Sequence, residues 1–183
     1  MNAVYKAIRV AKGLMKRINR AAITTTLLVL SFCEATASTQ ASAMANASAN
    51  VIQGIKMSRV SDLQFGSFVS GIPGTVTISP SGSRSANGPL ALSSANYPVS
   101  AASFLITGED SLVFNIILPD SASLQGPSGS KMTVNQFVSN PSHTGTLSSR
   151  GTATLSVGAT LNVGSNQTGG TYSGTFPVTV TYQ

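Results

Sequence analysis

The sequence is poor in charge, in cysteine and in the residue types that perform most enzyme chemistry. Charged residues make up 9% of the 183 residues, against roughly 25% in an average soluble protein. There is one cysteine, one histidine and no tryptophan. The hydrophobic fraction of 42% argues against intrinsic disorder, which comes with high charge and few apolar residues. We therefore expect one folded domain of ordinary size.

Residues that could carry catalysis or bind a metal are few and scattered. His143 lies in a turn-like loop, where a lone histidine is more often solvated than catalytic. Glu109 and Asp110 adjoin in a predicted turn, and the carboxylates are too sparse for a calcium site or for an acid/base pair in contrasting environments. The sequence has no nucleophile elbow, no phosphate-binding glycine loop and no His/Cys pair at metal spacing. We expect no enzyme activity, no metal and no cofactor.

The positive charge is concentrated at one end of the chain. Six of the eleven lysines and arginines lie within residues 1–20. Residues 38–183 carry five basic and four acidic residues, a net charge of +1. A basic chain often binds nucleic acid, but a nearly neutral domain gives no reason to expect that partner.

Residues 1–37 have the order of features of a secretory signal peptide. A basic stretch over 1–20 precedes an apolar run over 21–33, which is too short to span a bilayer. Ala35-Thr36-Ala37 then supplies the small-x-small pattern that signal peptidase recognises. We expect cleavage before Ser38, or before Met44 at a second such pattern.

The only cysteine falls on the signal side of either cleavage site. Phe32 precedes Cys33, whereas a lipoprotein signal has a small residue there, so a lipid anchor is not expected. The mature chain would then have no thiol and no disulfide. We expect an exported protein that passes through the periplasm to the cell surface or is secreted.

Residues 38–50 form a low-complexity stretch of small residues. Apolar residues recur at every second position in it and just beyond it: Ala41, Ala43, Ala45, Ala47, Ala49 and Val51. A period of two is the alternation of a β-strand. The stretch is either a flexible spacer or a thin strand that pairs along a sheet edge.

Residues 51–183 are predicted to form an all-β domain. No window shows a sustained helical period with caps at both ends, and glycine and proline occur throughout. Seven or eight short strands of uneven length favour an immunoglobulin-like β-sandwich over a barrel. The expected strands cover residues 52–60, 74–78, 97–107, 112–118, 131–138, 153–163 and 171–182.

The clearest candidate hairpin joins residues 97–107 to residues 112–118. Gly108-Glu-Asp-Ser111 between them is typical turn chemistry. Four large apolar side chains of these two segments are expected in the core: Phe104, Phe114, Ile116 and Leu118.

The last residues carry the most specific pattern. Phe176, Val178, Val180 and Tyr182 alternate with threonines and a proline, and Tyr182 is the penultimate residue. Gly170 is the fourteenth residue counted back from the end. This pattern resembles the C-terminal signature of chaperone–usher pilus subunits.

Further motifs resemble a family of secreted bacterial proteins that is catalogued only as a domain of unknown function. These motifs are Asp62-Leu-Gln-Phe-Gly66, Gly158-Ala-Thr-Leu161 and the glycine-rich start of residues 169–180. The similarity extends from about Ala49 to Gln183. Asp-Leu-x-Phe-Gly also resembles the early strand of spore-coat-U-like pilins.

The resemblance to pilus subunits implies an incomplete immunoglobulin-like sandwich that lacks its last strand. In that family a periplasmic chaperone first fills the resulting groove, an outer-membrane usher assembles the fibre, and the next subunit's N-terminal extension then replaces the chaperone. Here the last strand would be residues 175–182 and the donor arm residues 38–50. The pairing residues would be Gly170, Phe176, Val178, Val180 and Tyr182.

A self-contained secreted or surface sandwich is the alternative. Such a domain would bind a glycan or a protein through its loops, of which residues 81–89 and 125–130 are long enough. The two hypotheses differ in whether the mature chain needs a chaperone to stay soluble.

Overall fold

The computed structural model describes residues 40–69, 71–93, 95 and 97–183. Contacts within the chain separate residues 1–49 from a domain of residues 50–183. The expected signal segment and Cys33 lie outside the described residues. Residues 40–49 are exposed and contain no strand, and Val51 is also exposed.

The described part of the domain contains strands, turns and one short 3₁₀ turn, η1 (Pro127–Gly129), but no α-helix, which confirms the all-β prediction. The strands are β1 (Lys56–Ser61), β2 (Gln64–Phe65), β3 (Gly74–Ile78), β4 (Arg84–Asn87), β5 (Val99–Ser100), β6 (Ala102–Thr107), β7 (Val113–Ile117), β8 (Ser121–Gln125), β9 (Lys131–Asn140), β10 (Thr144–Thr146), β11 (Thr152–Val163) and β12 (Thr179–Tyr182).

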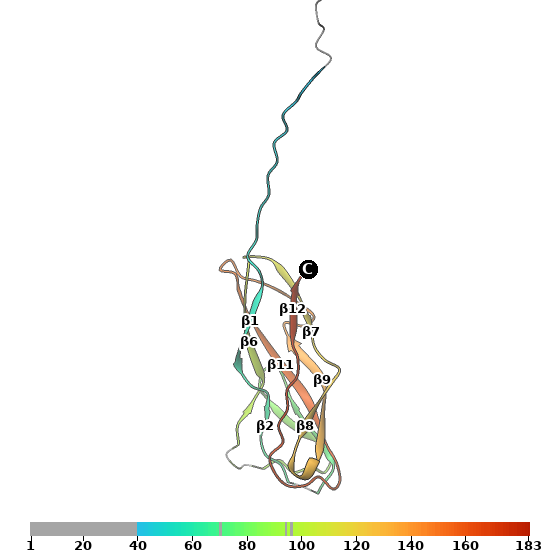
Figure 1. The fold of residues 1–183 in the computed structure, drawn as a ribbon. Helices are drawn as coiled ribbons and strands as arrows, with labels where there is room; N and C mark the ends of the chain where they lie inside the picture. Colours follow the sequence, from blue (N-terminus) through green and yellow to red (C-terminus); the bar gives the residue numbers. More distant parts are fainter. Residues whose placement is uncertain (1–39, 70, 94, 96) are drawn as a thin grey trace, which may run out of the picture. The chain divides into compact units, whose positions relative to one another are not determined.

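The long strand β11 organises the larger sheet (Figure 1). Its first half pairs with β6, which pairs in turn with β1. Its second half pairs with β3, and β3 pairs with β4. β9 pairs along the other edge of β11, and β8 pairs with β9. All of these pairs are antiparallel.

A smaller sheet with the order β10-β7-β12 packs against the larger one. Phe114 of β7 is fully buried between the layers, together with Ile106 of β6 and Leu155 and Val157 of β11. Alternate residues of β6 and β7 face this core, as expected for a sheet with one solvated face, whereas residues 157–161 of β11 are all buried. The two layers form the predicted β-sandwich, and their arrangement is compatible with an immunoglobulin-like one.

A second core cluster is formed by residues of β3, β9 and the second half of β11, with residues of β8 packed against it. It is centred on Val76, Ile78, Met132, Val134 and Leu161, all of which are buried. Phe65 of β2 packs onto it together with partly buried neighbours.

The predicted hairpin between residues 97–107 and 112–118 is wrong in its pairing. β6 pairs with β1 and β11, whereas β7 pairs with β10 and β12. Residues 108–112 do form a turn, but it carries the chain from one sheet to the other, so both strands face the same core from opposite sides. Of the four expected core residues, Phe114 and Ile116 are buried and Phe104 and Leu118 are half-buried.

The last strand is shorter than predicted. β12 covers only residues 179–182, and residues 175–178 lie outside any strand. Pro177 explains the late start, because proline has no N–H to donate to a ladder. An isolated bridge between Ser173 and Gln125 is the remaining strand-like contact of this segment.

The predicted loop over residues 81–89 contains a strand. β4 pairs with β3 through a tight turn in which Ser79 N–H donates to Ser83 O and Gly82 has a φ of +83°. Arg84-Ser-Ala-Asn87 has no apolar alternation, because three of its four residues are exposed on an edge strand.

Candidate functional site

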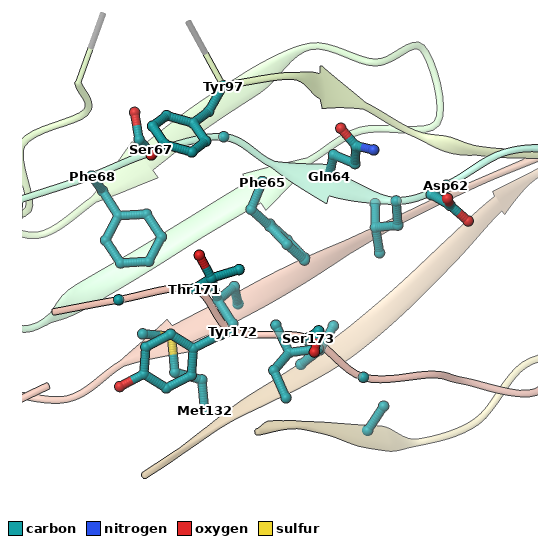
Figure 2. A pocket seen from close by; sticks show the side chains of 18 of the residues that line it. Asp62, Gln64, Phe65, Ser67, Phe68, Tyr97, Met132, Thr171, Tyr172 and Ser173 are labelled. Carbon is teal, nitrogen blue, oxygen red and sulfur yellow. The ribbon is translucent and has the colours of Figure 1, made fainter. Parts of the chain in front are cut away.

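An open groove lies between an early and a late segment of the domain. Residues 62–68 form its first wall and residues 167–176 its second, and its volume is about 560 Å³. Its floor is apolar and belongs to the second core cluster, with Met132, Val134 and Leu161. Figure 2 shows Phe65 and Phe68 extending from the first wall toward the segment that carries Thr171 and Tyr172.

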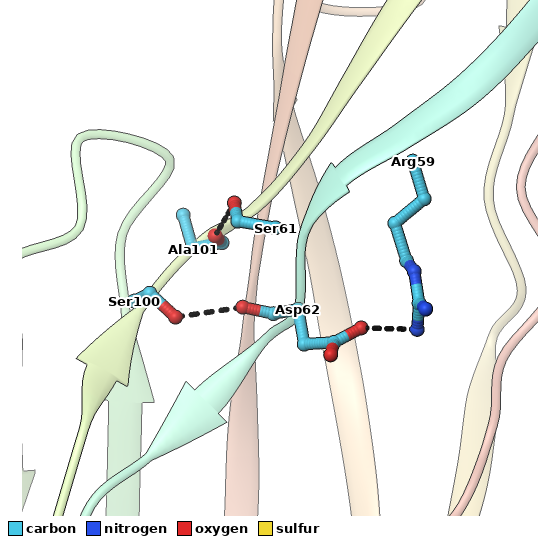
Figure 3. A network of polar contacts seen from close by, with 5 residues as sticks. All are labelled: Arg59, Ser61, Asp62, Ser100 and Ala101. Atoms are coloured by element: carbon cyan, nitrogen blue, oxygen red, sulfur yellow. Dashed lines mark hydrogen bonds and ion pairs between the residues drawn. The ribbon is translucent and has the colours of Figure 1, made fainter.

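The first wall begins with a bend that links β1 to β2. Ser100 Oγ donates to the carbonyl oxygen of Asp62 at 2.7 Å, and Ser61 Oγ donates to the carbonyl oxygen of Ala101 at 3.1 Å (Figure 3). The carboxylate of Asp62 pairs with Arg59 at 2.6 Å on the exposed surface. These contacts fix where the chain leaves β1 and enters the groove wall.

The Asp-Leu-x-Phe-Gly motif is explained by the packing of this wall. Phe65 is buried against the floor, and Gly66 has a φ of +71°. A Cβ at Gly66 would lie 2.2 Å from Nη1 of Arg84. The Arg84 guanidinium donates to the carbonyl oxygens of Phe65, Ser67 and Ser93 at 3.2–3.3 Å. Glycine at 66 therefore allows the arginine to hold the wall in place.

The second wall is held by the hydroxyl group of Tyr172. This group donates to the carbonyl oxygen of Thr168 at 2.8 Å, accepts from Gln167 Nε2 at 2.7 Å and bonds Ser130 Oγ at 2.8 Å. Gly126 lies directly against the ring, since a Cβ there would be 2.2 Å from a ring carbon. The glycine is thus required for the close approach of the tyrosine.

Gly170 and Phe176 are the two predicted pairing residues that line the groove. Gly170 has a φ of +146° and a Cβ there would lie 2.4 Å from the Pro127 ring, so both backbone and packing favour glycine. The Phe176 ring packs on Phe137 of β9 with centroids 5.0 Å apart. Phe176 therefore joins the second wall to the larger sheet.

The other three predicted pairing residues continue from the second wall onto the smaller sheet. Val178, Val180 and Tyr182 are half-buried and pack on the core around Phe114. Within the described residues, β12 pairs only with β7, from Thr179↔Ile117 to Tyr182↔Phe114. β12 is consequently an edge strand with apolar side chains on its inner face.

The Tyr182 hydroxyl group fixes the entry of the chain into the domain. It accepts from the Glu109 N–H at 2.7 Å and donates to the Gln53 carbonyl oxygen at 2.8 Å. The Gln53 N–H in turn donates to Glu109 Oε2 at 2.8 Å. The backbone just after the predicted arm is therefore held at the end of β12.

The sequence patterns singled out two residues of the second wall, Gly170 and Phe176, as candidate pairing residues, and none of the first wall. The floor residues and residues 62–68 were not predicted as part of a site, although Asp62-Leu-Gln-Phe-Gly66 was singled out as a motif. The structure brings this motif opposite Gly170 and Phe176 across the groove. The arm residues Ala41, Ala43, Ala45, Ala47 and Ala49 lie in the exposed stretch before the domain.

The described residues contain no cluster of three or more His, Cys, Asp or Glu side chains that could hold a metal ion. His143 is exposed, with a φ of +61°. The groove is lined by one charged residue, Asp62, whose carboxylate pairs with Arg59. No helix within the described ranges is long and apolar enough to cross a membrane.

Comparison with protein families gives a match over most of the domain. A family model described as a domain of unknown function (DUF4402) matches residues 55–182, which include both walls of the groove and all of its floor. No curated protein and no solved structure matches the chain. Because the model covers more than half of the sequence, the chain belongs to the DUF4402 family.

Proposed function

We propose that this protein is a structural subunit of a bacterial surface fibre, assembled by strand complementation. The single observation that carries the proposal is the open groove between residues 62–68 and 167–176, whose floor consists of core residues. A groove of this kind is completed when an extended segment adds a strand, with main-chain hydrogen bonds for affinity and alternate side chains for register.

The edges that border the groove support this assignment. In the first wall, Phe65 of β2 pairs with Val99 along one edge of its strand. In the second wall, Ser173 pairs with Gln125 along one edge of its segment. Beyond the groove, on the smaller sheet, β12 is also paired on one edge only within the described residues. An edge strand with free N–H and C=O groups is a template for another chain.

The exposed stretch before the domain supplies a donor for a neighbour. Residues 40–49 are exposed, and their apolar side chains recur with the period of a strand. In this proposal the chain is exported, its groove is covered by a periplasmic chaperone, an outer-membrane usher assembles the subunits, and its arm then pairs with a neighbouring subunit.

The competing function is a self-contained secreted domain that binds through its loops. Export of the chain alone, into a periplasm without a matching chaperone or usher, distinguishes the two. We expect degraded or aggregated protein, because the strands beside the groove then have unpaired edges that can pair with other chains. A soluble monomer, shown by size-exclusion chromatography with mass determination, would favour the self-contained domain.

A further inference from the structure

Three hydrogen bonds tie the segment just before β1 to the ends of two other strands. The hydroxyl group of Tyr182 donates to the carbonyl oxygen of Gln53 at 2.8 Å and accepts from the Glu109 N–H at 2.7 Å. The Gln53 N–H donates to Glu109 Oε2 at 2.8 Å. Each of these three residues is therefore bonded to the other two, and the group they form is called the clasp below.

The turn after β6 leaves a close-fitting place for the tyrosine. Gly108 directly follows β6 and is buried. A Cβ at this position would lie 2.2 Å from the Tyr182 hydroxyl oxygen and 3.1 Å from Leu147. The first distance is far inside the roughly 3.5–4.0 Å at which non-bonded heavy atoms make favourable contact. Any side chain at residue 108 would thus displace the hydroxyl group from the clasp.

The clasp joins the two sheets and lies close to the arm. Glu109 follows β6 of the larger sheet, and Tyr182 ends β12 of the smaller sheet. Gln53 comes three residues before β1 begins at Lys56 and three residues after the predicted arm, residues 38–50. In the proposed fibre the arm holds one neighbour, and the groove, whose second wall leads into β12, holds the other. The clasp therefore lies between the two connections of each subunit.

Tension on the arm has two routes into the domain. One route follows the backbone into β1 and crosses the β1–β6 ladder. The other leaves the backbone at Gln53 and crosses the clasp to β12 and to the turn after β6. Because Gln53 precedes β1 in the chain, the bonds of the clasp receive the tension before those of the ladder.

We infer that the clasp is a mechanical link, which passes tension on the arm directly to the end of β12 and so protects β1 from being pulled out of the larger sheet. The inference rests on the proposed function, which supplies the tension. It gives the Tyr182 hydroxyl group the role of positioning the base of the arm against β12.

Pulling at constant force on the protein purified from its host, together with whatever partner completes it, tests this inference. The mature chain is expected to lack cysteine, so introduced cysteines can serve as the two points of attachment. One is Ser123→Cys, at an exposed position of β8. The other is either Ser48→Cys, in the arm before the clasp, or Ser58→Cys, in β1 beyond the clasp. The readout is the unfolding rate, which governs forced unfolding.

With the attachment at residue 48, we expect Tyr182→Phe to unfold about fivefold faster than the parent, because it lacks a hydrogen bond that carries the tension. With the attachment at residue 58, the two rates should be nearly equal. Glu109→Ala removes the acceptor of the Gln53 N–H and should reproduce both results. This second variant decides the question if Tyr182→Phe does not accumulate.

The same rate increase from both points of attachment would show that the hydroxyl group only stabilises the fold, and it would overturn the inference. Unchanged rates from both points would overturn it as well. Neither result would affect the proposed function. Recovery of the protein as a soluble monomer with nothing bound would refute the proposed function itself, and the same comparison of rates on that monomer would still show whether the clasp carries the tension.

Discussion

Phe114 has the largest fully buried side chain of the described residues and lies between the two sheets. Its side chain is fully buried, and its ring lies so close to β10 that a Cβ at Gly145 would be 2.4 Å from Cζ. Truncation to alanine removes the ring from between layers that cannot collapse onto each other. Phe114→Ala should therefore lower the free energy of unfolding by about 3–5 kcal/mol, which is a large part of the stability of a typical domain.

Val113→Ala is the matched control, because Val113 is the next residue of the same strand and is 38% exposed on its outer face. We expect it to cost less than about 1 kcal/mol. The assay is thermal unfolding of the protein purified from its host together with whatever partner completes it, at one protein concentration, since association makes the apparent stability concentration-dependent. The Phe114 variant should unfold about 10 °C or more below the parent. A cost below about 0.5 kcal/mol, or equal costs for both variants, would refute the assigned packing.

Three further changes test separate parts of the structure. Gly158→Ala would place a Cβ 2.1 Å from the carbonyl oxygen of Ile78 in the paired strand β3. It should lower the free energy of unfolding by about 2 kcal/mol or more in the same assay, and an unchanged midpoint temperature of unfolding would contradict the β11–β3 register. Tyr182→Phe removes the acceptor of the Glu109 N–H, so it should cost about 1 kcal/mol and speed amide exchange at Glu109; unchanged exchange would show that the bond does not form in solution. Val180→Asp places a charge on the inner face of β12 and should abolish accumulation in the periplasm, whereas Thr179→Asp on the exposed face should not; equal immunoblot signals would count against this orientation.

The fold class was predictable because the strands that form the core alternate clearly. β3 was predicted with its observed bounds, and β9 and β11 within two residues at each end. The missed strands β2, β4, β8 and β10 have five residues or fewer. Each contains at most two apolar residues, too few for a clear alternation, so their pairing is determined by neighbours distant in the sequence.

The candidate site was only half predictable for a related reason. The C-terminal pattern, through its resemblance to pilus subunits, suggested Gly170 and Phe176 as pairing residues, and that pattern is a local feature of the sequence. The opposite wall was not predictable, because nothing local places Phe65 and Gly66 across from them. That juxtaposition depends on the route of the chain through the bend after β1 and on Arg84, which is far from the motif in sequence. The pairing of β7 with β12 rather than β6 is non-local in the same way.

The state of the exported chain without residues 38–50 tests the central claim most directly. This claim is that the groove is completed by a strand from another molecule and that the arm completes a neighbour. A second chain, in which the same residues are replaced by glycine and serine, separates the effect of arm length from that of the alanine alternation. In the natural host, both chains should accumulate as monomers bound to a second protein and form no polymer, as measured by size-exclusion chromatography and mass spectrometry. A soluble monomer with nothing bound would contradict the claim.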